Sequence, residues 1–306
     1  DIVRKISIIA LTFLIILCGC SSKDKEEKID EVKEYRFASY YSWFLGKEYY
    51  EDLMSYQSSD NQTIDIGKEY GEKAYLDGEY LIVEASEQQK NALIAQNDKL
   101  LQQAIDEFSS IEKGFDVNVG DDYKTLSILM NQKSMQDVFS DDTFDTGINI
   151  LGIISLINAN RVLQTGDSNA CVEVTIQNLN SGNIVSKALF PYESISLTDK
   201  DWEKSETEDV MISSKYEEYT RIEATIEEIT EEKIIFQPSS EQQLYDDERL
   251  ELCLDSVYAE DVYIPYGLTK GDKVSLMVNG MYAIHDDGND IPDLAPISII
   301  PLQYLD

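Results

Sequence analysis

The sequence predicts an α+β protein, in which a mostly helical N-terminal and middle domain with one β-hairpin precedes a small five-stranded β-barrel. Three observations favour this class. Apolar residues recur at helical spacing in several early segments, a stretch near residue 170 alternates with a period of two, and short alternating segments fill the C-terminal part. With 306 residues, the chain is long enough for two domains.

The first residues have the features of a signal peptide. Arg4 and Lys5 precede a run from Ile6 to Leu17 that is apolar except for Ser7 and Thr12. A membrane-spanning helix needs about twenty apolar residues. Because this run is shorter and has a basic start, it is typical of a secretory signal.

The run ends in Leu17-Cys18-Gly19-Cys20, which resembles the lipobox of bacterial lipoproteins. The resemblance implies a signal peptide over residues 1–20, cleavage after Gly19 and a diacylglyceryl group on the Cys20 thiol. Two acyl chains anchor a protein stably, because each buried methylene contributes about 0.8 kcal/mol. The expected location is therefore the outer face of the membrane of a Gram-positive bacterium, with the charged residues 21–34 as a tether. An ordinary secretory signal or an uncleaved anchor is the alternative.

Residues 35–198 are predicted to form the helical α+β domain. Its first segment, from Tyr35 to Tyr56, is dense in aromatic residues at spacings of three and four, which is typical of a helix with one aromatic face. Such a face can stack on sugars, but it more often packs against a neighbouring helix. We therefore expect these rings in the core.

Two helices are predicted in the middle of this domain. Ser86 and Gln89 have the spacing of a capping box, and apolar residues at helical spacing follow as far as Gly114. A second helix is expected over residues 123–139, with Asp122 as its N-cap.

The domain ends with a third helix and a hairpin. Residues 148–163 are apolar on most faces, as in a buried central helix. Residues 170–176 alternate between apolar and polar side chains, a polar turn follows, and residues 184–190 return, which predicts a β-hairpin. The polar and acidic residues 199–218 are then predicted to be a linker, in which Trp202 is isolated.

The C-terminal domain, residues 219–306, is predicted to hold five short strands. A closed or nearly closed barrel would remove the exposed edges of such a sheet. The expected strands lie in the segments RIEATIEEI, KIIFQP, RLELCLD, KVSLMV and PISIIPL.

A recognisable order of motifs runs through this domain. A strand ending in a proline is followed by the hairpin residues Gly267, Leu268, Gly271, Asp272, Val274, Asn279 and Gly280. This order resembles a small OB-like β-barrel domain of unknown function in surface lipoproteins of Gram-positive bacteria. Since similar turns occur in SH3-like barrels, the barrel is predicted to be OB- or SH3-like. The family has no established catalytic residues, so the resemblance implies a fold and a location only.

Two sets of oxygen-bearing side chains are candidate sites. Asp286, Asp287, Asn289 and Asp290 form a loop that can hold a cation such as Ca²⁺. The spacing is not that of a calcium-binding EF-hand loop, so a solvated turn is the favoured interpretation and no metal is expected. The acidic groups at 120–122 and 140–145 can supply paired carboxylates for glycoside hydrolysis, but helix capping accounts for them as well.

The remaining reactive side chains are few. His285 is the only histidine, which excludes sites that need two imidazoles. Cys171 and Cys253 fall on the polar faces of predicted strands. A disulfide between them is one alternative, and two unpaired thiols are the other.

The charge excludes one class of partner. With 59 acidic and 25 basic residues, the formal net charge is −34, which repels nucleic acids. We expect a binding or interaction module of the cell envelope, without cofactor or enzymatic activity, whose partner is an envelope protein or a cell-wall component. The alternatives are a carboxylate-based enzyme acting on glycans and a solute-binding lipoprotein.

Overall fold

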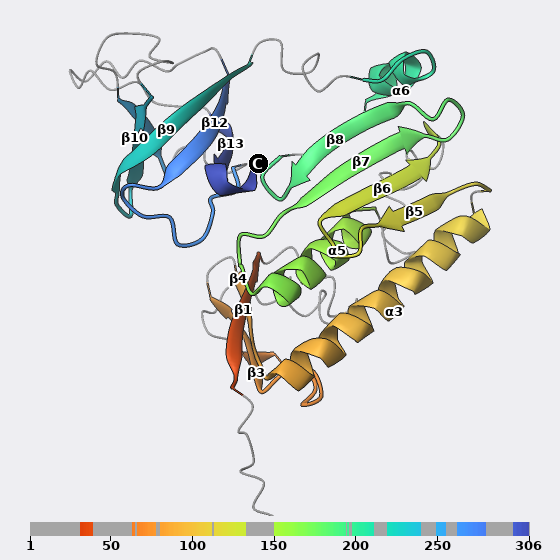
Figure 1. The fold of residues 1–306 in the computed structure, drawn as a ribbon, viewed down its shortest axis with the longest axis horizontal. Coiled ribbons are helices and arrows are strands. Elements are labelled where there is room, and N and C mark those ends of the chain that lie inside the picture. Colours follow the sequence, from red (N-terminus) through yellow and green to blue (C-terminus); the bar gives the residue numbers. More distant parts are fainter. Residues whose placement is uncertain are drawn as a thin grey trace, which may run out of the picture.

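The computed structural model describes twelve ranges of the chain. They are residues 31–38, 63–64, 66–77, 80–111, 113–132, 150–193, 195, 198–210, 219–239, 249–254, 262–279 and 296–305. Within these ranges the protein has three β-sheets and three α-helices, α3, α5 and α6 (Figure 1).

The first sheet, sheet A, is antiparallel and contains the N-terminal strands. Its order is β1-β4-β3-β2. In β1, Tyr35 and Phe37 are buried and alternate with Glu34 and Arg36, so the period is two and the segment is a strand. The predicted helix over 35–56 is therefore wrong for its first residues, and residues 39–56 lie outside the described part. The strands are β1 (Lys33–Ala38), β2 (Thr63–Ile64), β3 (Lys73–Asp77) and β4 (Tyr80–Ala85).

Helix α3 (Glu87–Ile111) follows β4 and confirms the predicted capping box. The Ser86 hydroxyl accepts a hydrogen bond from the Gln89 backbone N–H (3.3 Å), and the Gln89 side-chain oxygen accepts one from the Ser86 N–H (2.9 Å). Both bonds satisfy backbone donors that the first helical turn leaves free. Leu93, Leu101 and Ala104 then face the core.

The second sheet, sheet B, has the order β5-β6-β7-β8. Its strands are β5 (Asp116–Val119), β6 (Thr125–Met130), β7 (Val172–Asn178) and β8 (Ile184–Phe190). The predicted hairpin near residue 170 is confirmed as β7 and β8. The predicted helix over 123–139 is wrong over its first part, because β6 runs parallel to β7 and buries Leu126, Ile128 and Met130 at alternate positions. Residues 133–139 lie outside the described part.

Helix α5 (Ile150–Thr165) connects the parallel strands β6 and β7 and fills the centre of the first core. It packs against α3, β1 and β7. All residues from Gly152 to Asn160 are buried, including Ser155, Asn158 and Asn160. This confirms the prediction of a central helix that is buried on most of its faces.

The first half of the predicted linker is folded. Helix α6 (Asp199–Ser205) begins with a capping box formed by Thr198 and Asp201, and it lies against β8. Trp202 is only 2% exposed and belongs to the same core as α5. Thus Trp202 is not isolated, and residues 211–218 of the expected linker lie outside the described part.

The third sheet confirms the five C-terminal strands. The strands β9 (Tyr219–Ile229), β10 (Lys233–Pro238), β11 (Leu250–Cys253), β12 (Lys273–Asn279) and β13 (Pro296–Pro301) pair antiparallel in the order β11-β10-β9-β12-β13. In the described residues β11 and β13 are the edges, so the sheet is open there. It has its own apolar core, separate from the core around α5, and ends in a short 3₁₀ helix, η3 (Leu302–Tyr304).

The expectation of a mostly helical N-terminal and middle domain is wrong. Among the described residues of this region, eight strands in two sheets accompany only two long helices, and sheets A and B are joined by α3 and α5 (Figure 1). Over all the described residues, strand exceeds helix. The reason is that short strands such as β1 and β6 place apolar residues two and four apart, and part of this spacing also fits one face of a helix. These segments are strands because they pair with strands that are distant in the sequence, β1 with β4 and β6 with β7.

Candidate functional site

The residues predicted to carry the anchor and the cation loop lie outside the described ranges. These are Gly19 and Cys20 at the N-terminus, and Asp286, Asp287, Asn289 and Asp290 near the C-terminus, together with His285. Within the described ranges, no group of three His, Cys, Asp or Glu side chains is placed to hold a metal ion. None of the helices described there is both long and apolar enough to cross a membrane.

The carboxylates at 120–122 belong to a turn and not to a helix N-cap. Asp122 lies between β5 and β6, where its side chain accepts a hydrogen bond from the Lys124 N–H (3.0 Å) and pairs with Arg161 on α5 (3.4 Å). These contacts close the turn and fasten it to α5. The other acidic group, 140–145, lies outside the described part.

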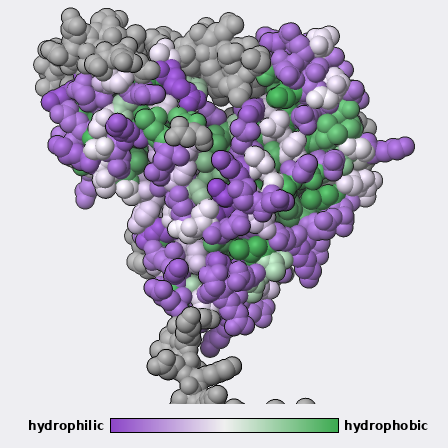
Figure 2. Space-filling view, in the orientation of Figure 1, coloured by the Kyte–Doolittle hydropathy of each residue, from purple (hydrophilic) through white to green (hydrophobic). Residues whose placement is uncertain are grey.

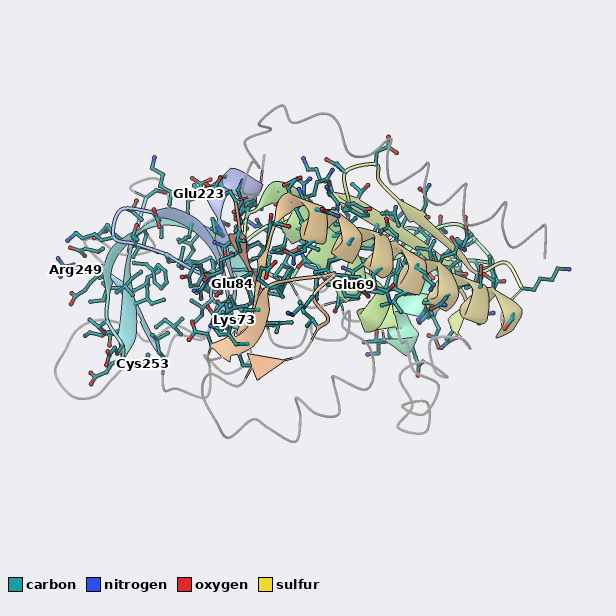
Figure 3. All side chains as sticks on the ribbon, turned by 90° about the horizontal axis from the view of Figure 1, so that it is seen from below. Glu69, Lys73, Glu84, Glu223, Arg249 and Cys253 are labelled. Atoms are coloured by element: carbon teal, nitrogen blue, oxygen red, sulfur yellow. The ribbon has the colours of Figure 1, made fainter. Side chains whose placement is uncertain are left out.

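The two described cysteines form no disulfide. Cys253 lies on β11, an edge strand of the third sheet. Figure 3 shows it at one end of the molecule, away from Lys73 and Glu84 of sheet A. Cys171 lies just before β7, and burial raises the pKa of its thiol to about 11. At neutral pH the Cys171 thiol is therefore protonated, which makes it a poor nucleophile.

A buried polar network connects α3, α5 and the turn before β6. The Asn97 amide donates to the Asn160 side-chain oxygen (2.8 Å), and the Asn160 amide donates to Asp98 (2.9 Å). The Tyr123 hydroxyl lies 3.0 Å from both Asp98 oxygens. Burial, followed by the charge and hydrogen bond of Asp98, raises the pKa of Tyr123 to about 12. Tyr123 also has a φ of +57°, an uncommon backbone conformation for a residue other than glycine.

The most distinctive surface lies where the C-terminal sheet meets sheets A and B. We call it the junction. It contains a group of tyrosines with a few polar partners, and the C-terminal end of the described chain lies beside it, between the third sheet and β8 (Figure 1). The junction residues are Arg36, Tyr80, Asp167, Asn169, Tyr192, Tyr263, Tyr266 and Tyr304.

The centre of the junction is Tyr192, which follows β8 and is almost completely buried. Its ring stacks on Tyr304 (centroids 5.9 Å apart) and meets Tyr263 edge to face (5.4 Å). Its hydroxyl donates to the Asn169 carbonyl (2.7 Å), and the Tyr304 hydroxyl donates to Asp167. Burial raises the pKa of both Tyr192 and Tyr304, so both phenols stay neutral at physiological pH.

The outer part of the junction is built around Tyr266. The Arg36 guanidinium lies over the Tyr266 ring at 4.4 Å, and Tyr80 meets the same ring edge to face at 5.5 Å. Arg36 also pairs with Glu34 (2.8 Å) and Asp77 (3.2 Å). Tyr266 nevertheless remains 40% exposed. This leaves a solvent-facing tyrosine beside a guanidinium, a combination that is enriched at protein interfaces.

The rest of the visible surface is mainly hydrophilic. Figure 2 shows polar residues over most of this face, with smaller apolar patches between them. Lys73 and Glu84, which form an ion pair of 3.8 Å on sheet A, lie close together in Figure 3. Such exposed pairs contribute little to stability.

Sequence reasoning did not identify the junction. Its five tyrosines come from four separate segments, and the only local signal is the spacing of Tyr263 and Tyr266 around Pro265. No family model, no curated protein and no solved structure matches the chain.

Proposed function

We propose that this protein is a lipoprotein anchored by a diacylglyceryl group on Cys20 to the outer face of a bacterial membrane, where it acts as an interaction module of the envelope. The observation that carries this proposal is the order of the first twenty residues: a basic start, a short apolar run and Leu-Cys-Gly-Cys. Only a cysteine can form the thioether, and a cysteine stands at the position where the lipobox requires it.

The junction supports a role in binding. Tyr266 is exposed next to Arg36, and tyrosine and arginine contribute most to binding energy at many protein interfaces. Both side chains are held in place, Arg36 by Glu34 and Asp77 and Tyr266 by contacts to Tyr80. A preordered surface of this kind loses little conformational entropy when a partner binds.

The anchor is tested by labelling the full chain with an alkyne-bearing fatty acid in a Gram-positive host. We expect Cys20→Ser to abolish the label and release the protein from the membrane fraction. Cys18→Ser is the matched control, because it changes a cysteine two residues away that leaves with the signal peptide. Label on the Cys20→Ser variant would refute the anchor.

The binding role is tested by photo-crosslinking in the same cells. A photoreactive amino acid at position 266 is expected to form a covalent adduct with an envelope protein or wall fragment. Position 229 is the control, because Ile229 is similarly exposed (37%) but lies at the end of β9. Adducts of equal yield at both positions, or none at position 266, would argue against a binding surface at the junction.

A further inference from the structure

The segment between β11 and β12 has an alternating pattern of contacts. We call residues 262–268 the strap. Val262, Ile264 and Leu268 pack against the core of the C-terminal sheet, whereas Tyr263 packs against the core around α5. Tyr266 contacts Arg36 and Tyr80 of sheet A. Both ends of the strap are thus fixed in the core of the C-terminal sheet, which is one unit of the protein. Its tyrosines contact the other unit, which consists of sheets A and B with the core around α5.

Hydrogen bonds hold the strap to two further segments. The Asn169 amide nitrogen donates to the Tyr266 carbonyl (2.7 Å), and the Asn169 amide oxygen accepts from the Tyr266 N–H (2.8 Å). The Tyr80 hydroxyl donates to the Ile264 carbonyl (3.3 Å). The Asn169 side chain therefore satisfies both backbone groups of Tyr266, as the backbone of a paired strand would. Asn169 lies in a loop 97 positions away in the sequence.

The strap is also suited to keep one conformation. Pro265 is buried between Ile264 and Tyr266, and its ring fixes φ, which lowers the entropy lost on ordering. Gly267 has a φ of +72°, a value that glycine adopts without strain, and this allows the chain to turn away after Tyr266.

A second contact lies beside the strap. Tyr304 of η3 stacks on Tyr192, and its hydroxyl donates to Asp167 of the loop before β7. A third contact, the ion pair of Arg221 with Glu193 (3.3 Å), is partly exposed and adds little. The contacts of the strap and those of Tyr304 are therefore separated along the chain, and both hold the C-terminal sheet at the junction.

We propose that the strap locks the C-terminal sheet onto the rest of the protein, so that the two units behave as one rigid body and unfold together. This inference does not depend on the lipid anchor or on a partner. It assigns Asn169 and Tyr304 the role of positioning residues for the C-terminal sheet. The alternative is two units joined by a flexible connection, each with its own unfolding transition.

Hydrogen exchange of the full chain in detergent tests the lock directly. Asn169→Ala removes both bonds to Tyr266, and we expect the backbone N–H groups of residues 262–268, apart from Pro265, which has none, to exchange at least tenfold faster. Asn183→Ala is the matched control, because its amide donates to the Ser205 carbonyl within one unit (2.8 Å). Unchanged exchange of the strap in Asn169→Ala, or equal acceleration in Asn183→Ala, would overturn the proposal.

A milder pair of variants covers the case in which Asn169→Ala does not fold. Tyr304→Phe removes only the hydroxyl that bonds to Asp167 across the junction. Tyr75→Phe removes a hydroxyl that donates to Glu34 (3.4 Å) within sheet A. We expect calorimetry to show one transition for the unmodified protein and for Tyr75→Phe, and a broadened or split transition for Tyr304→Phe. Two separate transitions in the unmodified protein would refute the lock.

Discussion

Asn160 occupies a position in α5 where an apolar side chain would be expected, because its neighbours in the helix are buried in the core. Burying its amide costs desolvation free energy, which its side-chain hydrogen bonds offset. Asn160 receives one bond from Asn97 on α3 and gives one to Asp98. The asparagine therefore fixes how α3 and α5 sit against each other, as buried polar residues fix register in other helical interfaces.

Replacing Asn160 by alanine should be costly. The change leaves the buried Asn97 amide without its acceptor, and the partly buried Asp98 loses one of its donors. We expect the free energy of unfolding to fall by about 2 to 4 kcal/mol, measured by chemical denaturation. Gln132→Ala is the control, because it removes an exposed amide bond to Asp199 (2.8 Å) and should cost less than about 0.5 kcal/mol. Equal losses in the two variants would contradict this role.

The raised pKa of Tyr123 has a consequence at alkaline pH. Burial and Asp98 raise this pKa to about 12, above the usual value near 10, so the folded state favours the neutral phenol. This contribution to stability is fully present below about pH 10 and is lost as the pH rises toward 12. We therefore expect the difference in unfolding free energy between the native protein and Tyr123→Phe to shrink between these pH values. A difference that stays constant would show that Tyr123 does not titrate in this way.

At the scale of elements, the seven-residue helix α6 is fixed against sheet B by contacts at both of its ends and by Trp202. The Thr198–Asp201 capping box starts the helix, and Trp202 enters the main core. At its end, the Ser205 carbonyl accepts bonds from Ser181 (2.6 Å) and Asn183 in the turn between β7 and β8. The helix therefore fastens the end of sheet B.

Trp202→Ala should release this helix. Removing a buried tryptophan typically costs about 3 to 5 kcal/mol, because it loses apolar contacts and leaves a cavity. We expect a loss of this size in thermal or chemical unfolding, together with faster hydrogen exchange in α6. Glu203→Ala changes an exposed residue of the same helix and should leave both measurements nearly unchanged. A loss below about 1 kcal/mol for Trp202→Ala would contradict its burial.

The elements that could be predicted from the sequence are those whose signals are local. The capping box of Ser86 and Gln89, the apolar run of α5 and the alternation in β7 and in the C-terminal strands depend only on neighbouring residues, and all are confirmed. By contrast, β1 and β6 are strands because of partners elsewhere, at Ala85–Tyr80 and in β7. Their short apolar patterns did not distinguish them from helices.

At the scale of the whole molecule, two cores are joined by contacts between distant residues. Tyr80 and Ile264 are 184 positions apart, and Asp167 and Tyr304 are 137 apart. No periodicity or motif reports contacts of this range, so the junction could not be predicted from the sequence. The chain also carries 34 more negative than positive charges, and these repel one another when the chain is compact.

This repulsion predicts a dependence on salt. Adding sodium chloride to a low-salt buffer should raise the melting temperature, because ions screen the repulsion between carboxylates. Most of the rise should occur below about 0.2 M, where the screening length shortens to less than about 8 Å. The measurement is a series of thermal melts at fixed pH. A melting temperature that is constant, or that rises linearly to high salt, would indicate that repulsion is not the cause.

The arrangement of β1 matters when the chain is pulled. Among the described residues β1 is an edge strand, and its six residues pair antiparallel with β4, from Lys33 opposite Ala85 to Ala38 opposite Tyr80. The chain enters β1 at its Lys33 end, so a force applied along the strand from the N-terminal side acts at that end. A force on that end loads the pairs in shear, so they must break together rather than one after another. Under such a force, β1 therefore works as a mechanical clamp for sheet A.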